Sequence, residues 1–328
     1  MTNLSTRFFG LELRSPVIAA SCSMTGSHDQ IKKLVQAGAG AIVLKSIFEE
    51  EIHLQLQEEL KERNSLISDP EYLDYFDYVI RDENLNKMIG LIKQLKSDIE
   101  VPIVASVNCV SSSEWTFFAR KLQDAGADAI ELNLFIIPSD VVKSNDANEQ
   151  FYLETIRKVM ETVTIPVAVK ISHYFSNLAA MIKKLSLTGI AGITLFNRFY
   201  SPDIDIETQQ LISAGIFSGE NEYLLPLRWT GIMAPKIGCP LAATTGIHSA
   251  GTAVKFLLAG ASAVQVASVL YQEGPEAIGT INQGIADWMA AKGYRSIAEF
   301  MGKLSIRQKN ATAYERVQFM NWTRETAF

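Results

Sequence analysis

Two kinds of short apolar segment alternate strictly along this 328-residue chain. The first kind follows a helical stretch and a turn that contains Gly38, Gly126, Gly189 or Gly260, where a helix C-terminus favours a left-handed residue. The second kind opens with an X-Pro pair, as in VPIVASV from Val101, and such a pair ends one element and starts an extended one. The pattern predicts eight strands, and stretches with helical periodicity separate most of them.

Strands that are apolar on both faces and alternate with helices form a parallel sheet. Eight of them predict an α/β fold, a closed (β/α)8 TIM barrel, and an open doubly wound sheet is the alternative. Two excursions, at about 47–83 and 198–225, are too long for ordinary βα loops and would fall on the C-terminal face of a barrel. We expect one domain over 1–328, with a helical tail at about 275–328.

The composition excludes several classes of protein. The chain is 48% hydrophobic and 20% charged with a net charge of −6, which predicts a folded protein that does not bind nucleic acid. It shows no signal peptide and no run of about 18 apolar residues, so we expect a cytoplasmic protein without a membrane partner. Three scattered cysteines and four histidines without ligand spacing predict neither a disulfide framework nor a metal site.

Polar residues end most of the predicted strands and would meet at the mouth of a barrel. Lys45 and Lys170 end apolar strands, a costly place for an ammonium group unless it meets an anion or an electron-rich ligand. Lysines that only reach solvent are the alternative. His173, three residues beyond Lys170, is a candidate ligand contact at the same rim. The other strand-end groups are Ser21, Asn108, Asn133, Asn197, Thr244 and Thr245.

The segment ATTGIHSAGTAVKFLLAG joins a strand to a helix through Gly246, Ser249 and Gly251. Backbone N–H groups and a helix N-terminus can point at one spot there, which predicts a phosphate site. Ala267 and Ser268, after the eighth strand, would contribute to it. A glycine-containing turn without a ligand is the alternative.

These segments resemble the class 1 dihydroorotate dehydrogenases and the flavin domain of dihydropyrimidine dehydrogenase, over residues 5 to about 290. The resemblance is carried by FGLELRSPVIAAS, IVLKS, YLDYFDYV, IVASVNCVSSSEW, AGADAIELNL, IPVAVKIS and TTGIHSAGTAVKFLLAGASAVQVASVLYQEG. It implies an FMN-dependent oxidoreductase in a (β/α)8 barrel, acting on dihydroorotate or a related dihydropyrimidine or small acid in pyrimidine biosynthesis. It also implies a homodimer and is compatible with a redox partner subunit.

By this resemblance FMN lies across the mouth of the barrel. The residues expected to bind it are Ala20, Ser21, Lys45, Asn108, Asn133, Lys170, Ser218, Gly219, Thr245, Gly246, Ala267 and Ser268. Asn133, Asn197 and Arg198 would face the substrate, and Arg198 stands where the family has Ser or Thr.

The chain departs from the family at the position of the catalytic base. The family has Ser-Cys-Pro-Asn after its ELNL strand, where Cys or Ser takes the substrate proton, whereas this chain reads ELNLFIIPSD with Ile136 at that position. An isoleucine cannot act as a base. Candidates for a replacement are Ser139, Asp140, His173 and Tyr200. The substrate loop ahead of the YLDY-like segment is altered as well.

Three functions follow from these observations. The first is an FMN-dependent oxidoreductase, and the second is a flavin-binding homologue without dihydroorotate activity, acting as a regulator or an electron-transfer partner. The third is a flavin-free barrel isomerase that binds a phosphate group. A yellow purified protein would exclude the third, and electron acceptance from dihydroorotate would separate the first from the second.

Overall fold

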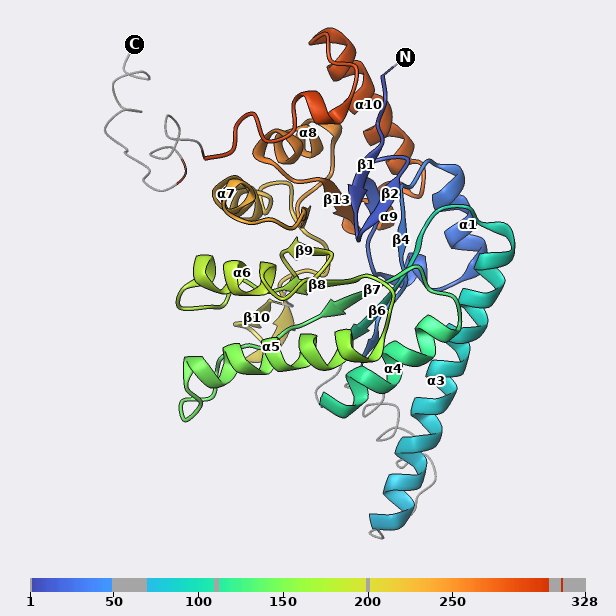
Figure 1. Cartoon of the computed structure of the whole chain (residues 1–328). Helices are drawn as coiled ribbons and strands as arrows, with labels where there is room; N and C mark the ends of the chain where they lie inside the picture. The colour runs from blue at the N-terminus through green and yellow to red at the C-terminus, as the bar shows by residue number, and fades with distance from the viewer. Residues whose placement is uncertain (1, 49–69, 109–111, 199–200, 307–313, 315–328) are drawn as a thin grey trace.

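The computed structural model describes residues 2–48, 70–108, 112–198, 201–306 and 314. Its centre is a ring of parallel strands at the positions that the alternating apolar segments predicted (Figure 1). The strands are β3 Val17–Ala19, β4 Ile42–Val43, β5 Ile47–Phe48, β6 Ile103–Asn108, β7 Ala129–Asn133, β8 Val167–Ile171, β9 Gly192–Leu195, β12 Leu241–Thr244 and β13 Ala263–Val266.

The ring is closed, because β13 pairs with β3 and β4 pairs with both β3 and β6. The other neighbours follow chain order from β6 to β7, β8, β9, β12 and β13, all parallel. The second barrel strand is interrupted, since β5 continues beyond β4 and pairs with β6. The prediction of a (β/α)8 TIM barrel is confirmed, and the open doubly wound sheet is excluded by the closure.

Helices surround the ring (Figure 1), and α6 (Leu178–Ser186) illustrates how one face of a helix is buried against it. In α6, Leu178, Met181, Ile182 and Leu185 are buried, at the spacing expected for one helix face, and Asn177 caps its start by accepting from the Ala180 N–H at 3.1 Å. The helices are α1 His28–Gln36, α3 Pro70–Asp98, α4 Ser112–Asp124, α5 Asn145–Thr162, α6 Leu178–Ser186, α7 Leu224–Met233, α8 Ala250–Ala259, α9 Ser268–Glu273 and α10 Ala277–Ala291, with short 3-10 turns at Ser23–Thr25, Ala234–Lys236 and Ile297–Glu299.

An antiparallel hairpin of β1 (Thr6–Phe8) and β2 (Leu11–Leu13) covers the N-terminal end of the barrel. The Phe8 side chain is fully buried there and packs into the barrel interior. It lies so close to Gly192 that a Cβ on that glycine would stand 2.5 Å from the Phe8 ring. The sequence pattern did not predict this hairpin, which closes one end of the barrel and leaves the other for a site.

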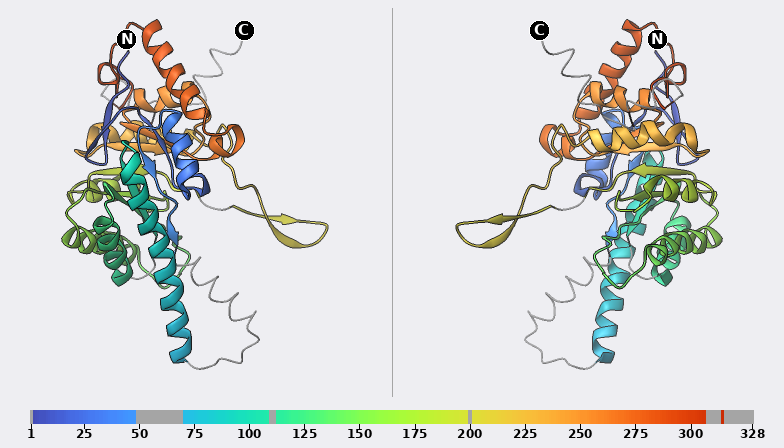
Figure 2. Two further views of the ribbon diagram at one scale, coloured as in Figure 1. Left: turned by 90° about the vertical axis from the view of Figure 1, so that its right-hand side faces the viewer. Right: turned by 90° about the vertical axis from the view of Figure 1, so that its left-hand side faces the viewer.

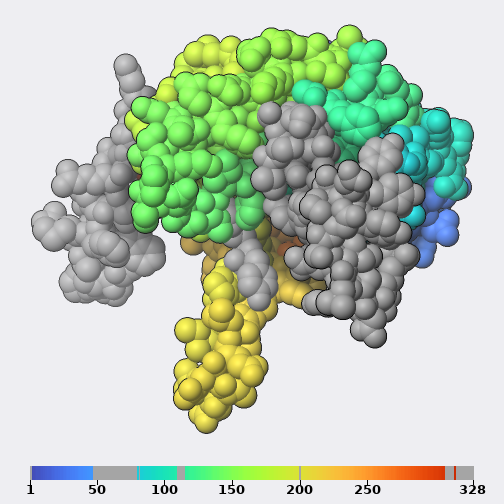
Figure 3. Space-filling view, turned by 90° about the horizontal axis from the view of Figure 1, so that it is seen from below, coloured from blue at the N-terminus to red at the C-terminus, as the bar shows by residue number. Residues whose placement is uncertain are grey.

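The second predicted excursion follows the end of β9, at the C-terminal end of the barrel, whereas the first starts two residues later than predicted, because Ile47 and Phe48 form β5. Within the first, residues 49–69 lie outside the described residues, and residues 70–83 form the first half of α3. The second contains the hairpin of β10 (Pro202–Asp205) and β11 (Gln210–Ser213), which projects away from the body of the protein (Figures 2 and 3). The predicted tail contains α10, and the single domain over 1–328 stays a prediction. Within the described part of the chain, no helix is both long and apolar enough to cross a membrane.

Candidate functional site

The inside of the barrel changes from apolar to polar along the strands. Near the covered end, the inward side chains are small or aliphatic, such as Val104, Ala129 and Ala168. Because inward positions recur every second residue, Ser106, Glu131 and Lys170 come next on the same strands. The polar layer therefore lies toward the open, C-terminal mouth, where TIM barrels build their sites.

A cavity of about 280 Å³ lies at this mouth, and we call it the mouth cavity. Eleven of the residues predicted for the mouth line it: Ala20, Ser21, Lys170, Asn197, Arg198, Ser218, Thr244, Thr245, Gly246, Ala267 and Ser268. Of the other predicted residues, Asn108 and Asn133 are buried at the ends of their strands, Lys45 is half-buried, and Gly219 is exposed. The mouth cavity thus brings together residues from five barrel strand ends and from the second excursion.

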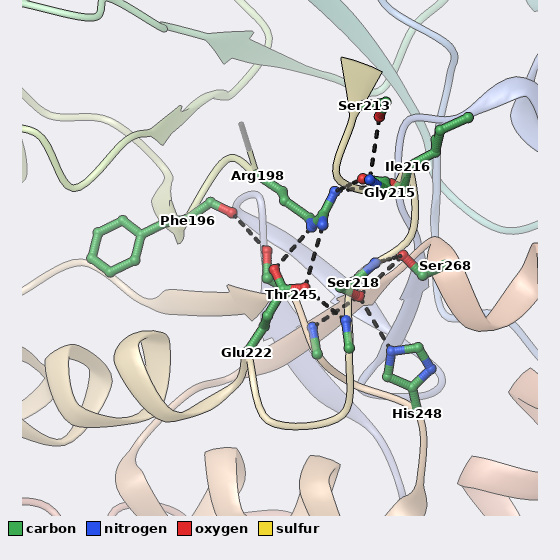
Figure 4. A network of polar contacts seen from close by, with 12 residues as sticks. Phe196, Arg198, Ser213, Gly215, Ile216, Ser218, Glu222, Thr245, His248 and Ser268 are labelled. Carbon is green, nitrogen blue, oxygen red and sulfur yellow. Dashed lines mark hydrogen bonds and ion pairs between the residues drawn. The ribbon is translucent and has the colours of Figure 1, made fainter. Parts of the chain in front are cut away.

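Part of the mouth-cavity lining belongs to a network of polar contacts that is rich in hydrogen-bond donors (Figure 4). Ser218 lies at its centre: its N–H donates to Ser268 Oγ at 2.9 Å, and its hydroxyl contacts His248 Nε2 at 3.2 Å. The Gly246 N–H donates to the Ser218 hydroxyl at 3.2 Å. Hydroxyls and N–H groups that converge in this way can bind a phosphate group. Ser249, also predicted for this site, instead caps α8 by accepting from the Thr252 N–H at 3.3 Å.

The turn after β12 has an unusual backbone. Thr245 and Gly246 both have positive φ, at 79° and 71°. A β-branched residue rarely adopts this conformation, and such outliers concentrate at ligand sites. A Cβ on Gly246 would lie 2.4 Å from the Tyr223 backbone nitrogen, so only glycine fits. The turn brings the backbone of the 245–246 segment against the start of α7 and fixes one wall of the mouth cavity.

The lining of the mouth cavity also includes Lys170, a residue that is only 9% exposed. Among the described residues, its Nζ has one hydrogen-bond partner, Gln265 Oε1, at the long distance of 3.5 Å. A buried ammonium group whose one hydrogen bond is this long is costly unless it gains a further partner. Its position is therefore suited to an electron-rich or anionic group in the cavity.

Two polar chains connect neighbouring strand ends beside the cavity. Ser21 contacts Ser46 at 3.0 Å between hydroxyls, and Ser46 contacts Ser106 at 2.6 Å. On the other side, Asn197 Nδ2 donates to Asn133 Oδ1 at 2.8 Å. The second contact joins two residues predicted to face a substrate, and among the described residues the Asn197 side-chain oxygen and the Asn133 amide nitrogen have no other hydrogen-bond partner.

Arg198 forms hydrogen bonds that hold together two parts of the second excursion (Figure 4). Its Nε donates to Glu222 Oε2 at 2.9 Å, and its Nη1 donates to the Ile216 carbonyl at 2.9 Å. Partial burial would raise the pKa of Glu222, but the hydrogen bonds from Arg198 and from the Gly219 N–H outweigh burial and lower it. The guanidinium is thus largely committed within the protein, and its predicted contact with a substrate stays a prediction.

The four candidate bases are placed differently. Ile136, at the family's base position, is half-buried, packs against the core and donates its N–H to Tyr152 Oη at 3.2 Å. Ser139 and Asp140 are exposed, and they line neither the mouth cavity nor the second cavity described below. Tyr200 lies outside the described residues.

His173 lines a second cavity of about 370 Å³, the side cavity, which shares Asn197, Arg198 and Thr245 with the mouth cavity. Burial lowers the pKa of His173, so its imidazole is neutral at neutral pH. A neutral imidazole beside the mouth cavity is the form that accepts a proton. Among the described candidates, His173 is therefore the one placed next to the site.

The geometry defines a barrel protein whose C-terminal mouth carries converging hydroxyl and N–H groups and a buried lysine, and the comparisons place it in a family. The dihydroorotate dehydrogenase family matches residues 76–289, so the chain belongs to this family. It is 27% identical over 314 residues to the dihydroorotate dehydrogenase B (NAD(+)) catalytic subunit of Methanothermobacter thermautotrophicus, covering 91% of this chain and 97% of that protein. The equally named proteins of Thermoplasma volcanium and Pyrococcus abyssi are 25% and 26% identical, covering 92% and 91% of this chain and 98% of each relative.

Several residues of the site were not predicted from the sequence. His248 and Tyr271 reach it only through the fold: Tyr271 Oη accepts from the Ser23 N–H at 2.8 Å and lines the mouth cavity. Glu131, Thr194 and Gln265 occupy the buried polar layer. A signal for this layer was present, because polar residues stand at inward positions of strands that are otherwise apolar.

Proposed function

We propose that the chain is an FMN-dependent oxidoreductase, acting on dihydroorotate or a related dihydropyrimidine or small acid in pyrimidine biosynthesis. The observation that carries the proposal is the mouth cavity, whose lining combines hydroxyl and N–H groups around Ser218, Gly246 and Ser268 with a buried lysine, Lys170. Flavin mononucleotide calls for both kinds of partner, because it carries an anionic phosphate and an electron-accepting ring.

The residues present fit this cofactor. The Ser218 hydroxyl and the N–H groups of the Gly246 turn would hold the phosphate, and a side chain on Gly246 could not be accommodated beside it. Ala20 and Ser21 would border the ring, and Lys170 would face its pyrimidine end. When bound, FMN accepts a hydride at N5, and a cation near the pyrimidine end stabilises the negative charge of the reduced ring. Asn133 and Asn197 would orient the substrate through their linked amides.

Titration of the apoprotein with FMN tests the proposal. We expect quenching of FMN fluorescence at a ratio of one per chain, and a yellow protein. Failure to take up flavin would contradict the proposal.

Lys170→Met is expected to weaken FMN binding by about 10- to 100-fold, because a charge-assisted hydrogen bond is worth roughly 1.5–3 kcal/mol. The reduction potential of the bound flavin should also fall. Lys183→Met is the matched control, since the Lys183 Nζ donates to the Lys236 carbonyl on the surface. His173→Gln should cost less affinity than Lys170→Met. Equal affinity and potential in wild type and Lys170→Met would contradict the assignment.

A second function is favoured by one observation, the apolar Ile136 at the base position. In this alternative the chain binds FMN but does not oxidise dihydroorotate, and serves as a regulator or an electron-transfer partner. The relatives' description as catalytic subunits supports the further proposal of a redox partner subunit. The flavin-free isomerase and the cytoplasmic location stay predictions.

The exposed β10–β11 hairpin supports the proposal of a homodimer. Ile204, Ile206 and Leu211 are 63%, 79% and 78% exposed on it, and large exposed apolar side chains mark interaction surfaces. A two-stranded hairpin is marginally stable alone in water, so a second copy of the chain would stabilise it. We expect Leu211→Asp to convert a dimer to a monomer in sedimentation experiments, and Thr208→Asp near the hairpin's tip to leave the dimer intact. A monomeric wild type would rule the dimer out.

A further inference from the structure

A fully buried carboxyl group lies in the polar layer of the barrel. Glu131, on β7, is 0% exposed and does not line the mouth cavity. Its Oε2 accepts from Gln265 Nε2 at 2.5 Å and from Thr194 Oγ1 at 3.0 Å. Its Oε1 has no hydrogen-bond partner among the described residues. A charge in this position is costly unless an opposite charge compensates it.

The compensating positive charge is the Lys170 ammonium group, and the side-chain amide of Gln265 connects it to Glu131. Gln265 turns its Nε2 toward Glu131 and its Oε1 toward Lys170 Nζ, at 2.5 Å and 3.5 Å. The reverse orientation would place the amide oxygen against the carboxylate and the NH₂ group against the ammonium. The carboxylate thus fixes the orientation of Gln265, and Gln265 presents its oxygen to Lys170 at the edge of the mouth cavity.

We propose that Glu131 is an anionic positioning residue that sets the charge balance beneath the bound flavin; this inference rests on the proposed function. Through Gln265 it holds Lys170 in place, and its negative charge offsets part of the positive charge that Lys170 presents to the ring. Electrostatic effects are strong in a buried, water-poor setting. The negative charge of Glu131 should therefore measurably change the reduction potential of the bound flavin. Glu131 therefore makes the flavin a weaker electron acceptor than Lys170 alone would.

The variant Glu131→Gln tests this proposal with little change of shape. The new amide oxygen can keep accepting from Gln265 and Thr194, while its NH₂ group takes the place of the oxygen without a partner. The matched control is Glu149→Gln, which removes a carboxylate that accepts from Lys184 on the outside of the barrel at 2.6 Å.

Sulfite is the probe. Its sulfur lone pair forms a bond to flavin N5, the electrons of the N5–C4a double bond move into the ring, and the negative charge comes to rest near N1 and the C2 carbonyl. Binding is read from the loss of absorbance at about 450 nm, a property of flavins in general. We expect Glu131→Gln to bind sulfite at least tenfold more tightly than wild type, with a more positive midpoint potential. Glu149→Gln should equal wild type.

The outcomes are separable. Flavin content is measured first, and a wild type that takes up no FMN overturns the proposed function and this inference with it. Equal or weaker sulfite binding in a fully loaded Glu131→Gln overturns the inference alone, because a purely structural role would not shift the affinity upward. If Glu131→Gln does not fold, Glu131→Met replaces it: this variant also removes the charge and keeps the hydrogen bond that Gln265 Nε2 donates to Thr194 Oγ1 at 3.1 Å. Glu131→Met must then show the same tighter binding of sulfite relative to wild type.

Discussion

Replacing Gly246 by alanine is expected to lower the affinity for FMN by about 10- to 100-fold. An alanine at a left-handed φ of 71° is strained, and its Cβ would meet the Tyr223 backbone nitrogen at 2.4 Å. Relief of this contact requires movement of the turn, because backbone cannot rotate away as a side chain can. Strain of this kind costs about 1–3 kcal/mol, and it falls on the turn that would hold the phosphate.

Gly251→Ala is the matched control for this prediction. It lies five residues further along, in the first turn of α8, where a Cβ would contact only Ser249 Oγ at an ordinary 3.7 Å. Alanine is favoured over glycine in a helix by about 1 kcal/mol, so this variant should bind FMN normally and unfold at the same or a higher temperature. Fluorescence titration and circular dichroism measure both variants. If Gly246→Ala folds and binds FMN as tightly as wild type, the phosphate does not lie at this turn.

Wild-type protein loaded with FMN is expected to be reduced slowly by dihydroorotate, at about 0.1 s⁻¹ or slower. Typical enzymes turn over at about 10 s⁻¹, and a positioned base contributes about 10²–10⁴-fold to such a reaction. Ile136 supplies no group that could take the proton, and its N–H is already engaged with Tyr152 Oη. Anaerobic mixing with excess dihydroorotate, followed by flavin absorbance, measures the rate.

Ile136→Cys should increase this rate if the rest of the substrate site is kept, whereas the neighbouring, exposed Ile137 provides the control variant Ile137→Cys. Fast bleaching in the wild type, at 1 s⁻¹ or above, would mean that another group serves as base. His173→Gln would then identify it, since the neutral His173 lies in the side cavity next to the mouth cavity. A wild-type rate that does not change in His173→Gln would exclude this histidine.

The barrel was predictable because its signals are local. Each X-Pro pair and each turn glycine marks an element boundary within a few residues, and Gly38, Gly126, Gly189 and Gly260 all have positive φ in the structure. The β1–β2 hairpin was missed because its segments are short, and what defines it is the burial of Phe8 inside a barrel formed by distant strands.

The candidate site was predictable in part for the same reason. The carboxyl ends of parallel strands meet at one face, so Lys170, Ser21 and Asn197 could be brought together without knowledge of any contact. Their partners could not be predicted, because the Arg198–Glu222 and Lys170–Gln265 contacts depend on side-chain directions in segments far apart in the chain. Arg198 was expected to face a substrate, and only the structure revealed its carboxylate partner.

The pairing that closes the barrel has a consequence for synthesis of the chain. Val17 of β3 is in register with Val264 of β13, so the first barrel strand has no partner on that side until nearly the whole chain has left the ribosome. Until then, the open edges of β3 and of the last strand formed are exposed to pairing with other chains. Contacts so distant in sequence also slow folding. Chains that stop before β13 should therefore aggregate. Loss of the four residues of β13, Ala263–Val266, should lower the yield of soluble protein more than loss of four residues on the surface.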